Sequence, residues 1–204
     1  MKKITFVLGV VFAVIFAACS KDDNNGIVLQ DHDQNRMMDS MHAMMSRMQA
    51  MTMTMDPDID FAEMMMMHHQ GAINMAQVEL SAGTNDSLKS FAQKVINDQQ
   101  AEIMQLESIL STLTVDNMDM EFMQEQMDNM DKTEKAADVQ IITGDVDNDF
   151  ATLMMIHHQA AIDDASGYLH HGSNIELKAI ATNIVTAQTM EIQELADWLK
   201  ANRR

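Results

Sequence analysis

The chain has 204 residues, a formal net charge of −18 and a hydrophobic fraction of 47%. Such an acidic chain repels nucleic acid, which excludes nucleic-acid binding as a function. The single cysteine, Cys19, leaves neither a disulfide nor a cysteine metal site to the folded part. The unusual feature is 24 methionines against 7 Phe, 1 Trp and 1 Tyr, because a thioether can fill a core or bind a soft metal ion.

The N-terminal residues predict export from the cytoplasm. Two lysines precede an apolar run, Ile4–Phe16, that is too short to span a bilayer comfortably, and small residues precede Cys19. Residues 1–18 therefore read as a signal peptide. The end of this segment resembles a bacterial lipobox, which implies lipidation of Cys19 and a tether over residues 19–34. An uncleaved membrane anchor is the alternative, and both place the remaining chain outside the cytoplasm, facing the periplasm or at the cell surface.

The first predicted helix lies in a methionine-rich segment, residues 35–55. Its methionines recur at helical spacing, and Asp31, Asp33 or Asn35 can cap its start. Leu, Ile and Val are absent between Met37 and Met55, although a purely hydrophobic face would have no reason to avoid them. Packing and metal binding both remain open for this stripe. Its candidate ligands are Met41, His42, Met44, Met45 and Met48.

An internal duplication organises the rest of the chain. Residues 60–110 and 149–199 agree at 22 of 51 positions at an offset of 89 residues. The first copy, residues 56–113, begins with an Asp-Pro helix start at Pro57 and turns at Gly83. The second copy, residues 145–204, turns at Gly172, where Ser173 and Glu176 predict a capping box. Each copy therefore predicts an antiparallel helical hairpin.

A second methionine-rich stretch, residues 114–144, separates the two hairpins. Four of its methionines again keep helical spacing among acidic residues, which predicts a linker helix with a second methionine face (Met120, Met123, Met127 and Met130). Neither amphipathic hairpin can bury its apolar face alone. The sequence therefore predicts an all-α fold, a four-helix bundle made of two repeated helical hairpins with additional Met-rich helical segments.

The candidate metal site lies where histidine and methionine share one face of each first hairpin helix. On a helical wheel His69 falls inside the apolar arc and His68 at its edge, with methionines one turn earlier. The second copy repeats this pattern. The alternative is that these are core histidines without a metal, hydrogen-bonded to Gln and Glu side chains. Which histidine of each pair coordinates stays open. The candidate ligands are Met65, Met66, His68, His69, Met154, Met155, His157 and His158.

Polar side chains on the second helix of each hairpin are expected to support these histidines. Gln99 and Glu102 share a helix face, and an antiparallel hairpin that turns at Gly83 brings them level with the histidine pair. Gln188 and Glu191 repeat them in the second copy. A histidine N–H is a natural partner for a buried glutamate, and this contact would fix the ring tautomer for metal binding.

The donor types select the metal. Thioether and imidazole together favour Cu(I), with silver as its chemical mimic. Structural zinc prefers cysteine and histidine, and di-iron bundles use several glutamates with Glu-x-x-His pairs, which this chain lacks. Zinc and iron are therefore the less favoured ions.

Two motifs resemble the DUF305 family, ferritin-like four-helix bundles of bacterial periplasms and surfaces. The family is marked by Met-x-x-His-His-Gln-x-Ala with a downstream Gln-x-x-Glu-Ile, and both copies carry this pattern, at 65–72 with 99–103 and at 154–161 with 188–192. Family cores often have proline before the first histidine, where this chain has Met67 and Ile156. The resemblance implies a ferritin-like bundle and, from members similar to periplasmic copper-binding proteins, copper sequestration or hand-over.

The leading hypothesis is a lipid-anchored, extracytoplasmic protein that sequesters, buffers or hands over Cu(I) or Ag(I), and that is not an enzyme. Expected partners are the metal ion, a metal-donor or metal-acceptor protein, and the membrane only through Cys19; self-association stays open. The alternative is a Met-rich helical protein-interaction module without metal. A redox enzyme is disfavoured, because the chain has few suitable carboxylates and no flavin, haem or nucleotide motif.

Overall fold

The computed structural model describes residues 29–202 as six α-helices and one short 3-10 helix, with no strand in that range. The α-helices are α1 (Arg36–Ala50), α2 (Pro57–Ala82), α3 (Asp86–Leu110), α4 (Met120–Asp138), α5 (Val146–His171) and α6 (Ile175–Ala201), and η1 (His32–Gln34) precedes α1. The all-α prediction is confirmed. The predicted signal peptide and Cys19 lie outside the described residues.

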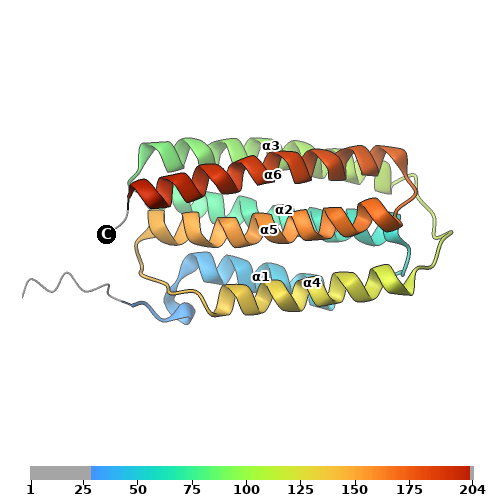
Figure 1. Ribbon diagram of the computed structural model, residues 1–204, viewed down its shortest axis with the longest axis horizontal. Helices are drawn as coiled ribbons and strands as arrows, with labels where there is room; N and C mark the ends of the chain where they lie inside the picture. Colours follow the sequence, from blue (N-terminus) through green and yellow to red (C-terminus); the bar gives the residue numbers. More distant parts are fainter. Residues whose placement is uncertain (1–28, 203–204) are drawn as a thin grey trace, which may run out of the picture.

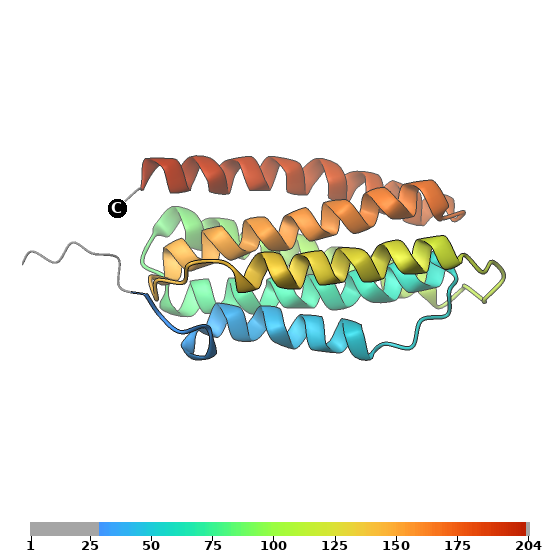
Figure 2. The same ribbon diagram turned by 60° about the horizontal axis from the view of Figure 1, so that its bottom comes forward.

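The helices form three layers of two, all aligned with the long axis of the molecule (Figure 1). α2 and α5 make the middle layer, α3 and α6 cover one face of it, and α1 and α4 cover the other face (Figures 1 and 2). α2, α3, α5 and α6 are the predicted four-helix bundle of two hairpins. The two methionine-rich segments supply the third layer, and no described helix is long and apolar enough to cross a membrane.

The hairpin turns are held by crossed caps. Asp58 at the start of α2 accepts hydrogen bonds from the amides of Ser173 and Asn174 in the turn of the other hairpin. Asp147 at the start of α5 accepts equivalent bonds from Thr84 and Asn85. Each hairpin therefore satisfies orphan amides of the other, as helix ends require.

One predicted helix-end detail is corrected by the structure and another is confirmed. Asn174, not Ser173, caps α6, because its side chain accepts from the amides of Glu176 and Leu177. The Ser173 hydroxyl instead donates to Asp58. Gly172 does end α5, but its φ is −66°, so no left-handed conformation requires it. Space does, since a Cβ there would lie 2.1 Å from Cε2 of Tyr168.

The two methionine-rich helices differ from their predictions and from each other. α1 ends at Ala50, so residues 51–55 are not helical, and it buries six methionines. α4 spans only 120–138 and buries one methionine, Met130, of the predicted stripe. Its buried face is otherwise Phe122, Gln126, Thr133 and Ala137. The second predicted methionine face therefore lies largely at the surface.

Candidate metal centre

The two histidine pairs meet in the middle layer of the molecule. α2 and α5 pack against each other, and each places its adjacent histidines at mid-helix with at most 1% of their surface exposed. The ring of His68 lies 3.7 Å from the ring of His157, centroid to centroid, at an angle of 45°. Because His69 and His158 flank this pair, the two copies converge on one buried cluster of four imidazoles.

Each hairpin holds its second histidine with a glutamate from its other helix. Nε2 of His69 lies 2.7 Å from Oε2 of Glu102, and Nε2 of His158 lies 3.0 Å from Oε2 of Glu191. Both contacts are close but bent away from ideal hydrogen-bond geometry. A carboxylate accepts only, so these contacts favour a proton on Nε2 and leave the lone pair on Nδ1. The register predicted from the turn at Gly83 is confirmed.

Nitrogen atoms of the cluster lack hydrogen-bond partners. Nε2 of His157 donates to the backbone carbonyl of His68 at 3.1 Å, which leaves the lone pair of His157 on Nδ1. This Nδ1, the Nδ1 atoms of His69 and His158, and both ring nitrogens of His68 are buried without a partner. Buried polar groups are usually paired, so unpaired nitrogens here are candidates for a ligand.

Burial keeps the central imidazoles neutral. The pKa of His68 and the pKa of His157 lie well below 6.5, first because burial disfavours the charged ring and then because neighbouring histidines would repel a second charge. A neutral imidazole is the form that coordinates metal. The cluster is therefore ready to bind a cation without first losing protons from these two rings.

Methionines of α1 lie against this cluster on the side away from α3. A Cβ at Gly71 would lie 2.6 Å from Sδ of Met44 and 3.1 Å from Nε2 of His157, so the bare glycine lets thioether and imidazole approach each other. In the second copy the matching positions carry Ala160 and Thr133. Only the first copy therefore contributes a methionine to this side of the centre.

The other predicted ligands fall into three groups. Met41, Met45 and Met48 are buried with Met44 in the core around α1, together with Met154, while Met65 is buried in a separate apolar cluster. Met66 and Met155 are only partly buried. The structure does not bring His42 to the others: its ring is 43% exposed and pairs with Asp138 at 2.9 Å.

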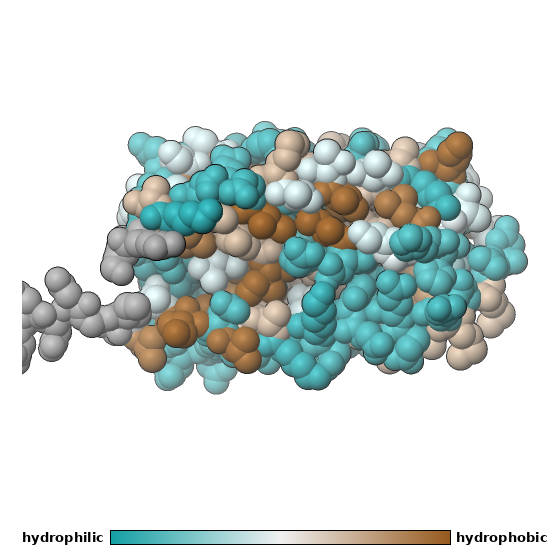
Figure 3. Space-filling view, in the orientation of Figure 1, coloured by the Kyte–Doolittle hydropathy of each residue, from teal (hydrophilic) through white to brown (hydrophobic). Residues whose placement is uncertain are grey.

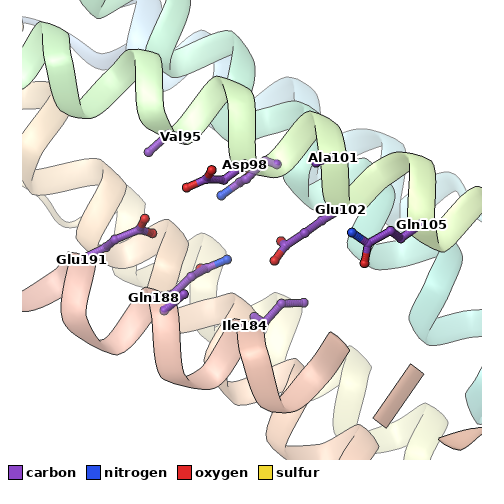
Figure 4. A pocket seen from close by; sticks show the side chains of 10 residues that line it. Val95, Asp98, Ala101, Glu102, Gln105, Ile184, Gln188 and Glu191 are labelled. Atoms are coloured by element: carbon purple, nitrogen blue, oxygen red, sulfur yellow. The ribbon is translucent and has the colours of Figure 1, made fainter. Parts of the chain in front are cut away.

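A cleft of about 240 Å³, lined by both polar and apolar side chains, opens between α3 and α6. Figure 4 shows Glu102 of α3 and Gln188 of α6 pointing into it, with Glu191 along the same wall. Gln99 and Gln188 are buried, and their Oε1 atoms have no partner. All four predicted supporting side chains therefore line one cleft, and its two glutamates are those that contact His69 and His158.

Lys94 is a site residue that sequence reasoning missed. Its Nζ lies 2.7 Å from Oε1 of Glu191, whereas the first copy has no such contact because position 183 is asparagine. Burial raises the pKa of Glu191, but His158 and Lys94 more than offset this and the pKa falls below its usual value. An alignment of the two copies shows that Asn183 replaces Lys94 and that Ala160 replaces Gly71. It does not show which side chains Lys94 and Gly71 contact.

The donor set fits a soft ion better than a hard one. Within residues 29–202 no three His, Cys, Asp or Glu side chains are grouped so that they could hold a metal ion. The soft donors beside these imidazoles are thioethers, and imidazole with thioether suits Cu(I) and Ag(I).

Two adjacent segments of the chain, residues 17–110 and 111–199, match the family described as a domain of unknown function, DUF305. The chain belongs to the DUF305 family. Its two matched segments correspond to the two copies in the structure, each a methionine-rich helix followed by a hairpin. No curated protein matches this DUF305 chain in sequence.

Solved structures of CopM are similar to this DUF305 protein. The Ag-bound form of CopM obtained by co-crystallization is 26% identical, with a TM-score of 0.54, and the match covers 72% of this chain and 98% of CopM. The Cu(I)-bound form is 25% identical with the same TM-score and coverage. The apo form is 27% identical with a TM-score of 0.54.

Proposed function

We propose that this protein binds Cu(I) or Ag(I) outside the cytoplasm and sequesters, buffers or hands over the ion without catalysing a reaction. The observation that carries the proposal is the buried cluster of four imidazoles, which contains unpaired nitrogens and packs beside the methionine-lined α1 through Met44 and His157. The similarity to CopM, which was solved with silver and with copper, supports the same chemistry.

Residues at different positions would have different roles, some as ligands and some as side chains that orient the ligands. His68 and His157 present unpaired nitrogens at the centre of the cluster, and Met44 brings a thioether to the ring of His157. Glu102 and Glu191 orient the outer rings, as carboxylates commonly do for histidine ligands. Both faces of the middle layer thus contribute, with soft donors on one side and orienting carboxylates on the other.

Location and partners belong to the same proposal. The N-terminal signal and Cys19 motif support a lipid-tethered protein that faces the periplasm or the cell surface. The strongly negative chain would raise the local concentration of cations. A donor or acceptor of the ion would be a protein partner.

The test is an anaerobic titration of the purified protein with Cu(I) against a competing chelator, with parallel titrations of Zn(II) and Fe(II). We expect tight Cu(I) binding and little response to the other two ions. The variant His157→Asn should lose at least about tenfold in Cu(I) affinity, or about 1.4 kcal/mol. His42→Asn is the matched control, because this surface histidine lies away from the cluster.

Circular dichroism melting of both variants separates loss of a ligand from loss of the fold. If His157→Asn stays folded and keeps full Cu(I) affinity and stoichiometry, the histidine centre is not the binding site. If the wild-type protein does not compete for Cu(I) at all, the proposal fails and a methionine-rich protein-interaction module becomes the better account.

A further inference from the structure

The segment that follows α1, residues 51–55, lies along the N-terminal half of α4. Nε2 of Gln49 donates to Glu134 at 3.0 Å, and the amide of Asp119 donates to the carbonyl of Met55 at 2.8 Å. These two contacts lie at Asp119 and Glu134, which are about 22 Å apart along α4. The chain between Gln49 and Met55 therefore follows α4 in the direction opposite to that helix, as the chain after α1 does in Figure 2.

Methionines line both sides of this contact. The segment after α1 carries Met51, Met53 and Met55, all partly exposed, and Met51 and Met53 also pack against the buried methionine core. On α4, Met120 is 64% exposed and Met127 is 47% exposed, with Met123 between them. Their spacing of three and four residues places them on one face, the face that also carries Glu134 toward α1. We call these six side chains the surface methionine cluster: Met51, Met53, Met55, Met120, Met123 and Met127.

The backbone at Met55 is strained, and the second copy shows that the strain is not needed for the fold. Met55 has a φ of +68°, and the matching residue of the second copy, Gly144, has a φ of +74°. Both amides donate to the same kind of acceptor, the aspartate five residues later. Glycine adopts this left-handed conformation freely, whereas a bulky side chain does not. A methionine held there against the backbone preference points to a role for its thioether.

The surroundings favour a cation. α4 carries six acidic residues and two lysines, and both lysines are paired, Lys132 with Asp163 and Lys135 with Asp131. The surface over α4 is largely hydrophilic in the space-filling view (Figure 3). Exposed thioethers in an acidic surface combine soft donors with an attraction for positive charge.

From these observations we infer that the surface methionine cluster is a second site for a soft monovalent cation, Cu(I) or Ag(I), held by thioethers of the 51–55 segment and of α4. This inference rests on the proposed function for its purpose, the capture of ions at the surface. Its site shares no residue with the histidine centre.

The test is Ag(I) titration of the full chain with ¹³C-labelled methionine methyl groups, followed by NMR. We expect Ag(I) to shift the methyl signals of Met53, Met55, Met120, Met123 and Met127. Met55→Gly should melt at a higher temperature, because the strain is relieved, and should bind Ag(I) at this site more weakly. The triple variant M120L/M123L/M127L keeps side-chain volume and should lose the site. M104L/M190L is the matched control, since Met104 and Met190 are equally exposed elsewhere.

A purely structural role for Met55 predicts a higher melting temperature with unchanged Ag(I) shifts, and that result would overturn the inference. So would shifts equal at Met104 and Met190. Repeating the titration with His157→Asn separates the two sites. Shifts that persist in this variant support the surface site even if the histidine centre fails, and shifts that vanish with it assign the surface response to the centre instead. Zn(II) should shift none of these methyl signals.

Discussion

At the scale of single residues, the duplication makes each difference between the copies informative. Gly71 and Ala160 occupy matching positions of α2 and α5, yet only position 71 faces Met44 and His157. A methyl group at position 71 would enter the space that these two side chains share. The missing side chain at this position is therefore part of the candidate centre.

We expect Gly71→Ala to weaken Cu(I) binding by about tenfold, because the added methyl displaces the thioether and the ring. Stability should change by less than about 1 kcal/mol, since the closest atom is the flexible end of Met44 and alanine favours a helix. Chelator competition and urea unfolding measure the two quantities. Ala160→Gly is the control, and equal effects from both variants would remove Gly71 from the centre.

Glu79 and Tyr168 occupy matching positions of the two copies, and each lies beside the aspartate at the start of the other hairpin. The hydroxyl of Tyr168 donates to Asp58 at 2.5 Å. Glu79 is fully buried near Asp147, and burial followed by the charge of Asp147 raises its pKa to about 8. It is therefore protonated at neutral pH and, like the tyrosine, can act as a donor to the aspartate.

This raised pKa gives a pH prediction with a definite sign. Because the folded pKa lies above the ordinary 4.5, the stabilisation is complete below pH 4.5 and is lost as pH rises through about 8. Glu79→Gln keeps a neutral donor, so from near pH 6 to near pH 9 it should lose about 1–3 kcal/mol less stability than the wild type. Urea unfolding at both pH values measures this. Parallel losses in the two proteins would show that Glu79 is ionised throughout.

At the scale of elements, α1 and α4 occupy the same layer but have diverged in chemistry. α1 buries six methionines, while α4 buries Gln126 and Thr133 and faces the buried Asp164 of α5. Asn129 of α4 donates to Asp164 at 3.1 Å. One interface therefore offers soft donors and the other a polar contact, although both helices dock onto equivalent partners.

Replacing methionine by leucine in α1 separates packing from ligation. Met41→Leu with Met44→Leu should change stability by less than about 1.5 kcal/mol, because the swap nearly conserves volume. It should lower Cu(I) affinity by at least about tenfold, because leucine has no donor atom. Met37→Leu with Met38→Leu, in the first turn of the same helix, is the control. Unchanged affinity in the first pair would make the buried stripe a packing feature only.

At the scale of the whole molecule, the crossed caps tie the two hairpins together. The turn of each hairpin is satisfied by an aspartate at the start of the other hairpin, Asp58 for one and Asp147 for the other. A hairpin that folded alone would leave these turn amides without their partners. The two copies are therefore expected to unfold as one unit.

We expect Asp147→Ala to destabilise the protein by about 1–3 kcal/mol, because it leaves the amides of Thr84 and Asn85 and the Thr84 hydroxyl without an acceptor. Asp58→Ala should cost more, since Asp58 also accepts from Tyr168. Denaturant unfolding provides the free energies. Asp86→Ala, at an exposed aspartate in the first turn of α3, serves as control. An equal loss of stability in this variant would show that the crossed caps contribute no more than an ordinary surface aspartate.

The helices, the duplication and the level at which His69 meets Glu102 could all be predicted from the sequence. These features depend on local periodicity, helix-end residues and one short turn, so they follow from neighbouring residues along the chain. The same reasoning placed methionine and histidine on one helix face. It could not tell Met44, which is buried beside His157, from Met127, which lies at the surface.

The contacts between side chains of different layers become visible only in the folded chain. The pairing of His68 with His157, the crossed caps of Asp58 and Asp147, and the path of residues 51–55 along α4 join positions far apart in sequence. Helical periodicity fixes which face of a helix is apolar but not which helix covers it. α1 packs its methionine stripe on α2, whereas α4 packs a face that carries Phe122, Gln126 and Thr133 on α5 and leaves most of its methionines at the surface.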